Sequence, residues 1–129
     1  MSGRKLLLDS NIVIYLAKKQ LLPEAFLRAD DVLFISDITF METLGYAFAD
    51  AIEKQETQNL VSILLRTPID DTIVQKVIVL RQNQKIKLPD AIIAATALVH
   101  ECILVTRNIS DFSGLLGLAV LNPFENEVV

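Results

Sequence analysis

Several carboxylates in the sequence stand where parallel strands would end or where helices would begin. Asp9 directly follows an apolar run, Asp37 follows a second run, and Asp111 comes shortly after a third. Asp90 opens a long apolar helix pattern, and Glu42 lies inside another helix pattern. The carboxyl ends of parallel strands meet along one edge of a sheet, where open α/β proteins bind their ligands, so acids placed there are expected to converge.

Each of these acids except Glu42 also has an ordinary structural interpretation. Asp9 can cap the helix that follows it, and Asp90 suits the first turn of its helix. Asp111 can close an Asx turn in a segment rich in turn formers. Asp37 has the features of a helix cap and nothing more, so we expect it to be structural.

Glu42 is harder to explain as a surface residue. Ile38, Met41, Gly45 and Ala49 share its helical stripe, which predicts that the stripe faces the core. An unpaired buried charge costs several kcal/mol, and no Lys or Arg lies within a turn of it. We therefore expect Glu42 to be paired, metal-bound or at the edge of a cleft, and a solvent-facing Glu42 is the alternative.

Four acids brought together at one sheet edge require a neutralising partner. Carboxylates within several Å of each other repel, and some take up protons unless a divalent cation is bound. The sequence has one His and one Cys, so the ligands would be oxygens, which suit Mg²⁺ or Mn²⁺ better than zinc. Such ions serve phosphate chemistry by lowering the pKa of a bound water. The expected set is Asp9, Glu42, Asp90 and Asp111.

Strand and helix patterns alternate along the chain, which predicts a mostly parallel sheet covered by helices on both faces. The expected strands cover residues 4–8, 32–35, 103–106 and 119–121. The expected helices cover residues 11–19, 23–29, 38–49, 53–66, 73–80 and 91–100. Residues 81–87 and 107–114 are expected to be loops, and we interpret residues 1–129 as one α/β domain.

Length and composition exclude several classes of protein. The 129 residues leave room for one domain, and 52% apolar with 22% charged residues excludes disorder for most of the chain. Polar residues interrupt the apolar stretch at 91–105, so we expect no membrane span, and without a secretory signal we expect a cytosolic protein. Cys102 is the only cysteine and is expected to be a core residue. The net charge of −4 argues against a broad basic face.

Five segments resemble the PIN domain, and specifically the VapC-type toxins of bacterial and archaeal toxin–antitoxin pairs. Residues 6–14 (LLLDSNIVI) are similar to the opening strand and its acidic turn, and residues 35–42 (ISDITFME) to the helix with the family's glutamate. Residues 88–97 (LPDAIIAATA) and 104–112 (LVTRNISDF) resemble the third and fourth acidic motifs, and 120–123 (VLNP) the closing strand. One departure is the sequence after the glutamate, where many relatives have Leu.

The resemblance implies a three-layer α/β/α fold with a central, mostly parallel sheet. It also implies a metal-dependent endoribonuclease that cuts structured RNA such as tRNA, with the four acids around one or two Mg²⁺ or Mn²⁺ ions. In such a protein Asn11 would help to hold the first acid, and Thr106 and Asn108 would position the site. The expected partners are an RNA substrate, a VapB-like antitoxin and a second copy of the chain.

Basic residues near the acidic motifs are candidate contacts for RNA phosphates. We favour Lys85, Lys87 and Arg107, which flank those motifs, over the more distant Lys18 and Lys19.

Three other interpretations explain parts of the sequence pattern. A haloacid dehalogenase phosphatase would need a second acid where Asn11 stands, and a response-regulator receiver would need an acidic pair after the first strand and a late lysine. A catalytically silent PIN-like module that binds RNA or a protein remains the main alternative, although the chain has lost none of the four acids.

Overall fold

The computed structural model describes residues 3–125 together with the backbone of residues 127 and 128, and its sheet has the order β3-β2-β1-β4-β5-β6. The first five strands are parallel, and β6 runs antiparallel to β5. The strands are β1 (Lys5–Leu8), β2 (Val32–Ser36), β3 (Leu65–Thr67), β4 (Ile103–Val105), β5 (Val120–Asn122) and β6 (Glu127–Val128). The mostly parallel sheet predicted from the sequence is confirmed.

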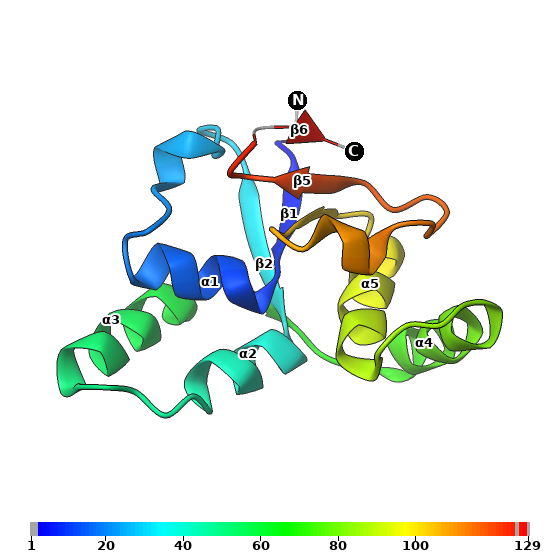
Figure 1. Ribbon diagram of the computed structural model, residues 1–129, viewed down its shortest axis with the longest axis horizontal. Coiled ribbons are helices and arrows are strands. Elements are labelled where there is room, and N and C mark those ends of the chain that lie inside the picture. Colours follow the sequence, from blue (N-terminus) through cyan, green and yellow to red (C-terminus); the bar gives the residue numbers. More distant parts are fainter. Residues whose placement is uncertain (1–2, 126, 129) are drawn as a thin grey trace.

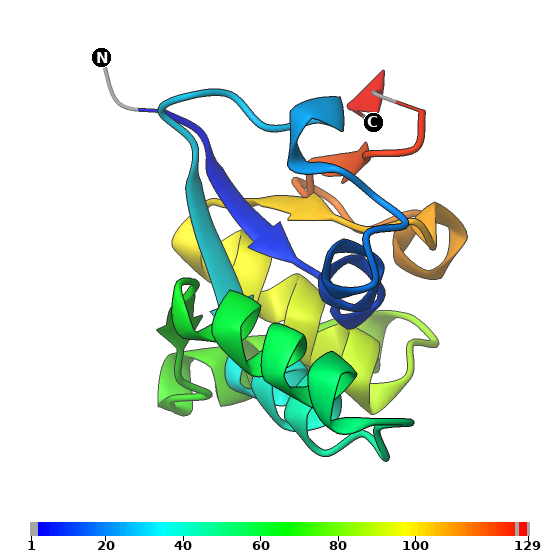
Figure 2. The same cartoon turned by 90° about the vertical axis from the view of Figure 1, so that its left-hand side faces the viewer.

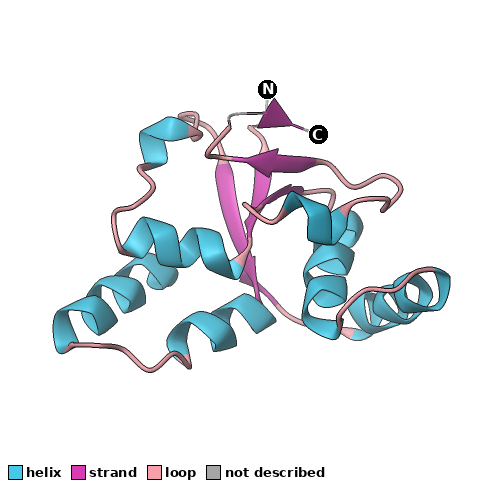
Figure 3. Cartoon of the chain, viewed as in Figure 1, coloured by secondary structure: helices cyan, strands magenta, loops and turns pink. Residues whose placement is uncertain are grey.

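Helices cover both faces of this sheet (Figures 1 and 3). They are α1 (Ser10–Ala17), α2 (Asp37–Leu44), α3 (Ala51–Ser62), α4 (Asp71–Asn83) and α5 (Leu88–His100), with short 3-10 helices η1 (Pro23–Ala25) and η2 (Ile109–Phe112). Successive residues of β1 point to opposite faces, so Leu7 packs in a core with α4 and α5, whereas Leu6 and Leu8 pack in a second core with α1 and α3. The three-layer arrangement is therefore confirmed.

The central position of β1 determines where the candidate site lies. β1 pairs with β2 on one side and with β4 on the other, and its carboxyl end leads directly into α1 (Figure 2). The ends of β2 and β4 stand beside it, so the residues that follow these three strands meet at one edge.

Several segments differ from the elements expected from sequence, among them the helix expected over residues 23–29, of which only the 3-10 helix η1 (Pro23–Ala25) forms. Residues 65–67 form strand β3, although we expected a helix through residue 66, and pairing with β2 satisfies their backbone groups. Helix α2 ends at Leu44 because Gly45 caps it by donating its backbone N–H to the carbonyl of Met41. Helix α4 extends to Asn83, into the expected loop.

The buried face of α2 also differs from the expectation. Met41 is 58% exposed and Glu42 is exposed, whereas Thr39 and Thr43 are buried. The Thr43 hydroxyl donates to the carbonyl of Thr39 at 2.8 Å, so burial leaves it no unsatisfied hydrogen bond. The prediction that the stripe around Glu42 faces the core was wrong, and its carboxylate is accessible.

Helix α5 is buried between the sheet and α4, as its apolar pattern predicted. Small side chains, among them Ala91, Ala94 and Ala95, let it pack closely against its neighbours. Cys102, just before β4, is buried as expected. Among the residues that the structure describes, no helix combines the length and the apolar character needed to cross a bilayer.

Candidate active site

Asp9 lies at the carboxyl end of β1 and is 6% exposed. Its Oδ1 accepts the backbone N–H of Ser10 at 2.8 Å, which makes Asp9 the N-cap of α1. Its Oδ2 accepts the Asn11 side-chain amide at 3.0 Å and the Thr106 hydroxyl at 2.8 Å. Three donors therefore hold a buried carboxylate in one orientation, and capping accounts for only one of them.

The segment after β4 supports Asp9 from the neighbouring strand. The backbone N–H of Asn108 donates to the Thr106 hydroxyl at 3.1 Å, which orients that hydroxyl toward Asp9. Asn11 also accepts the backbone N–H of Arg107 at 3.4 Å through its Oδ1. The predicted supporting residues Asn11, Thr106 and Asn108 are thus assembled around the first acid.

Glu42 reaches this cluster through Ser10. The Ser10 hydroxyl donates to Glu42 Oε1 at 2.6 Å, and it also lies 3.3 Å from the hydroxyl of Thr39. The bond joins the first turn of α1 to α2. Glu42 is exposed, which is the solvent-facing alternative expected from the sequence, and its carboxylate accepts a hydrogen bond from Ser10.

Asp90 and Asp111 line a polar cleft of about 470 Å³ between η2 and the α4–α5 connection. Lys85 and Lys87 line the same cleft, as does Arg81, whose Nε–H donates to the carbonyl of Ile86 at 3.2 Å. The cleft therefore has acidic and basic side chains along the same opening. By contrast, Lys18 and Lys19 lie near Glu53 and Glu56 of α3 at 3.8 and 3.9 Å, in keeping with a surface role.

The four acids interact electrostatically. Burial raises the pKa of Asp9, and Glu42 raises it further, which outweighs the opposing effect of the three hydrogen bonds. Partial burial raises the pKa of Asp90, and Asp111, Asp9 and Glu42 raise it further while Lys87 opposes them. Asp90 is therefore repelled by the other three acids, as expected if the four carboxylates lie near one another.

Asp37 stands apart in function from these acids. It pairs with Arg66 of β3 at 3.0 Å and accepts the backbone N–H of Ile69 at 3.3 Å. It follows Ser36, which caps α2. These bonds tie α2 to β3 and to the segment after it, which agrees with the structural role expected for Asp37.

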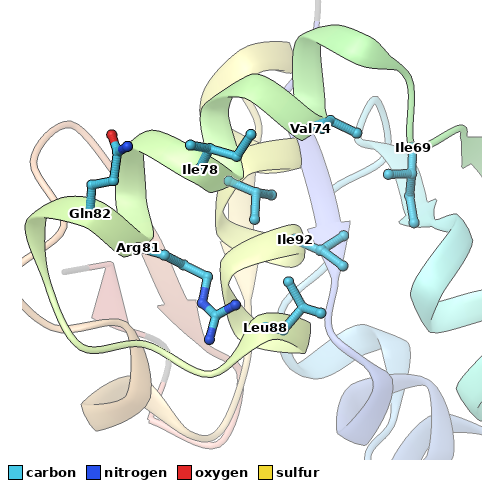
Figure 4. A pocket seen from close by; sticks show the side chains of 8 residues that line it. Ile69, Val74, Ile78, Arg81, Gln82, Leu88 and Ile92 are labelled. Carbon is cyan, nitrogen blue, oxygen red and sulfur yellow. The ribbon is translucent and has the colours of Figure 1, made fainter.

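A second cavity of about 450 Å³, between α4 and α5, contains none of the acids (Figure 4). Apolar side chains such as Val74, Ile78 and Leu88 line it, and Arg81 extends along its border toward the α4–α5 connection. This apolar lining lacks the convergent polar groups that a catalytic site requires.

The carboxylate oxygens of the acidic cluster, Asp9, Glu42, Asp90 and Asp111, are ligands of the kind that a hard divalent cation prefers. Within residues 3–125, no three Asp, Glu, His or Cys side chains stand close enough together to hold a metal ion by themselves. Mg²⁺ keeps several of its waters and is bound through one or two carboxylates plus substrate phosphates, so it does not require such a cage. The donors and their mutual repulsion are therefore compatible with an ion that water and substrate help to hold.

Comparisons with known proteins agree with this geometry. A sequence model of the PIN domain family matches residues 6–113, a span that includes the four acids and their supporting residues. A chain of a toxin–antitoxin complex from Klebsiella pneumoniae is 37% identical with a TM-score of 0.71, and the match covers 92% of this chain and 97% of that one.

Two further solved structures have the same architecture. A VapBC complex from nontypeable Haemophilus influenzae is 25% identical with a TM-score of 0.72, and the match covers 93% of this chain and 98% of that one. A DNA-bound VapBC from Salmonella typhimurium is 22% identical with a TM-score of 0.75 over the same shares, and at that identity it shows the fold alone. No curated protein sequence matches the chain.

Proposed function

The chain belongs to the PIN domain family, and from that premise we propose that it is a metal-dependent endoribonuclease and the toxin of a VapBC-type pair. The observation that carries the proposal is the acidic cluster. Three acids, Asp111, Asp9 and Glu42, raise the pKa of Asp90, and three donors hold Asp9 in a single orientation. Repelling acids held in this way are a feature of functional sites rather than of stable surfaces.

In this proposal Asp9, Glu42, Asp90 and Asp111 hold one or two Mg²⁺ or Mn²⁺ ions. Bound there, such an ion supplies a water of lowered pKa and neutralises charge on the phosphate as the bond is cut. The four acids themselves would be the catalytic residues, because they are the groups nearest to the reacting atoms.

The remaining residues keep these acids in place. Thr106 and Asn11 donate to one oxygen of Asp9, which directs that carboxylate and favours its charged form despite burial. Asn108 orients Thr106, and Ser10 orients Glu42. Such outer contacts hold ligands ready before the substrate arrives.

The polar cleft beside Asp90 and Asp111 is the proposed entry for RNA. Lys85, Lys87 and Arg81 line it and can contact phosphates of the strand on its way to the acids. Structured RNA such as tRNA is the substrate class that the family resemblance implies. A cytoplasmic location, where such RNA is found, follows from the same proposal.

A VapB-like antitoxin and a second copy of the chain are the proposed partners. The solved structures that resemble this chain include toxin–antitoxin complexes, one of them at 37% identity. An antitoxin that covers the acids would keep the nuclease inactive. We expect a small open reading frame beside this gene to encode the antitoxin, and co-expression of the two followed by co-purification checks this partner.

The direct test is incubation of the antitoxin-free protein with total RNA, with Mn²⁺ or EDTA. We expect discrete fragments from the wild type with Mn²⁺, and none with EDTA or from Asp9→Asn or Asp90→Asn, which keep shape but remove charge. Asp71→Asn, in the exposed first turn of α4, is the matched control and should cut normally. Full activity of both site variants would contradict the assignment of the acids.

One observation favours a second candidate, a PIN-like module that binds RNA or protein without cutting it. In the described part of the chain no three acids are gathered into a metal-holding group. RNA binding without fragments, in protein shown to be folded and supplied with Mn²⁺, would favour this candidate over the nuclease.

A further inference from the structure

Arg107 is exposed but is held in place by two aromatic rings. Its guanidinium carbon lies 4.2 Å from the centroid of the Phe124 ring and 5.4 Å from that of Tyr15. Its Nη1–H donates to the Tyr15 hydroxyl at 3.0 Å. The two rings pack edge to face with centroids 5.0 Å apart. These three residues, the Arg107 stack, come from three different segments of the chain.

Each member of the Arg107 stack is held in place by other parts of the fold. Tyr15 belongs to α1, and Phe124 follows β5 in a turn where its backbone N–H donates to the side chain of the buried Asn122 at 3.0 Å. The backbone N–H of Arg107 points to Asn11, which also holds Asp9. The guanidinium is thus preorganised at a fixed position, and the backbone of Arg107 lies beside the residue that holds the first acid.

The charge of Arg107 is left without a carboxylate across residues 3–125. Arg66 is a useful comparison, because it also stacks on a ring, that of Phe40 at 4.3 Å, yet it pairs with Asp37 at 3.0 Å. No such ion pair is found for Arg107 within that range. A guanidinium has five N–H donors, and among the described residues Arg107 uses one of them, on Tyr15, which leaves the others for a ligand.

We propose that the Arg107 stack is a preformed binding site for a phosphate of the RNA strand, and this inference rests on the proposed function. A planar, fixed guanidinium matches the two oxygens of a phosphodiester, and it has lost its rotational freedom before binding. Arg107 makes the contact, and Tyr15 and Phe124 are positioning residues that hold it.

The site also implies a path for the strand. The stack brings together α1 and the segment after β5, whereas the basic side chains of the cleft come from α4 and the α4–α5 connection, and α1 and α4 lie on opposite sides in Figure 1. Asn11 links the backbone of Arg107 to Asp9, whereas Asp90 and Asp111 line the cleft. An RNA strand that passes over the acids would therefore contact Arg107 at one end of the site and the basic residues of the cleft at the other.

The test measures binding of a short fluorescein-labelled single-stranded RNA by anisotropy in EDTA, where metal-dependent cleavage is stopped. For Arg107→Gln we expect about tenfold weaker binding at low salt. The slope of log K against log salt concentration should also become about 0.7 shallower, which is the value for one lost phosphate contact on a single strand. A merely structural role would not change this slope.

Three further variants separate charge from positioning. Arg107→Lys should restore the salt slope but not the full affinity, because the ammonium lacks the planar fork. Tyr15→Phe, which removes the hydroxyl that accepts from Arg107, and Phe124→Leu, which removes a cation–π contact, should keep the slope and weaken binding about two- to fivefold. In cleavage assays with Mn²⁺ these variants should raise KM and leave kcat nearly unchanged.

Arg66→Gln is the matched control and should bind RNA as the wild type does. If Arg107→Gln also binds with unchanged affinity and slope while the wild type still cuts RNA, the stack is not a phosphate site and the nuclease proposal stands. If the wild type neither binds nor cuts RNA, the proposed function fails, and this inference fails with it.

Discussion

The carboxylate of Asp9 is subject to two opposing influences. Burial disfavours its charged form, whereas Ser10, Asn11 and Thr106 donate hydrogen bonds that favour it. The net effect is a raised pKa in the absence of a cation. A divalent ion beside Asp9 would reverse that effect, because its charge would favour the ionised carboxylate.

The Thr106 hydroxyl allows a test of this support. Thr106→Val keeps the shape of the side chain but removes the donor to Asp9 and the acceptor for Asn108. We expect the Mn²⁺ concentration needed for half-maximal cleavage to rise about ten- to hundredfold, as for other contacts that orient a metal ligand. Cleavage assays over a range of Mn²⁺ concentrations measure this half-maximal concentration.

Thr57→Val is the matched control for this substitution. Thr57 is equally buried, but its hydroxyl donates to the carbonyl of Glu53 inside α3, far from the acids in the sequence. Its Mn²⁺ requirement should stay at the wild-type value. An equal change in both variants would show that the Thr106 effect comes from loss of packing or of general stability.

The raised pKa of Asp90 predicts how the free energy of unfolding depends on pH when no metal is bound. Its pKa is raised in the folded protein, so it stabilises the fold in full below its unfolded pKa of about 3.9, and this contribution is lost as pH rises through the folded pKa. Asp90→Asn avoids that loss, since it stays neutral. In EDTA at neutral pH we expect its Tm to exceed that of the wild type by about 2 °C, after allowing for solvent screening.

The difference in Tm should shrink as the pH falls through the raised folded pKa of Asp90 toward its unfolded value of about 3.9. Thermal melts across this range measure it. Asp71→Asn, which removes a first-turn acid from α4, should give no such gain. A Tm for Asp90→Asn that stays below the wild-type value at neutral pH would show that Asp90 is not destabilised by its neighbours.

Helix α5 places Asp90 by close packing. Ala94, one turn further along, is completely buried in the core that α5 shares with β1 and α4. Ala94→Leu would force the helix away from the sheet at a cost of about 1–3 kcal/mol. Urea denaturation should show this loss, whereas Gln75→Leu on the exposed side of α4 should unfold near the wild-type concentration.

The elements could be predicted where a buried apolar run marks them. Strands β1, β2, β4 and β5 and helix α5 are of this kind. Strand β3 is not, because Leu65 and Arg66, two of its three residues, are exposed, so no burial pattern marks it. It is identified only by its pairing with β2.

The candidate site could likewise be predicted only in part from the sequence. Asp9, Asp90 and Asp111 stand at strand ends or helix starts, which the sequence displays, and four acidic motifs in order, including that of Glu42, support the family. The sequence also singles out Arg107 as a candidate phosphate contact, but its stack could not be predicted, since Arg107 and Tyr15 lie 92 residues apart. The exposure of Glu42 could not be predicted, because the spacing of apolar residues does not reveal that threonines form the buried face of α2.

For the whole molecule, the acidic site and the net charge of −4 act in the same direction. Both resist the approach of RNA until cations are bound. The basic residues are therefore needed locally, at the cleft and at Arg107, rather than as a broad positive face. This explains how an acidic protein can be proposed to act on nucleic acid.

Metal binding should therefore stabilise the whole fold. At a free Mn²⁺ concentration about ten times Kd, mass action adds about 1.4 kcal/mol to the free energy of unfolding. We expect the Tm of the wild type to rise by several degrees and EDTA to reverse the rise. Asp90→Asn should show a smaller rise, and an unchanged wild-type Tm at millimolar Mn²⁺ would contradict a metal site.

The bond from Thr106 to Asp9 joins residues 97 positions apart, because β1 pairs with a strand that comes late in the chain. During synthesis on the ribosome, β1 and the first acid emerge before Thr106, Asp111 and the ring of Phe124. A growing chain thus carries only some of the four acids, and the proposed nuclease activity can begin only after these later residues have emerged. A partner synthesised beforehand would meet the chain at the moment its site is completed.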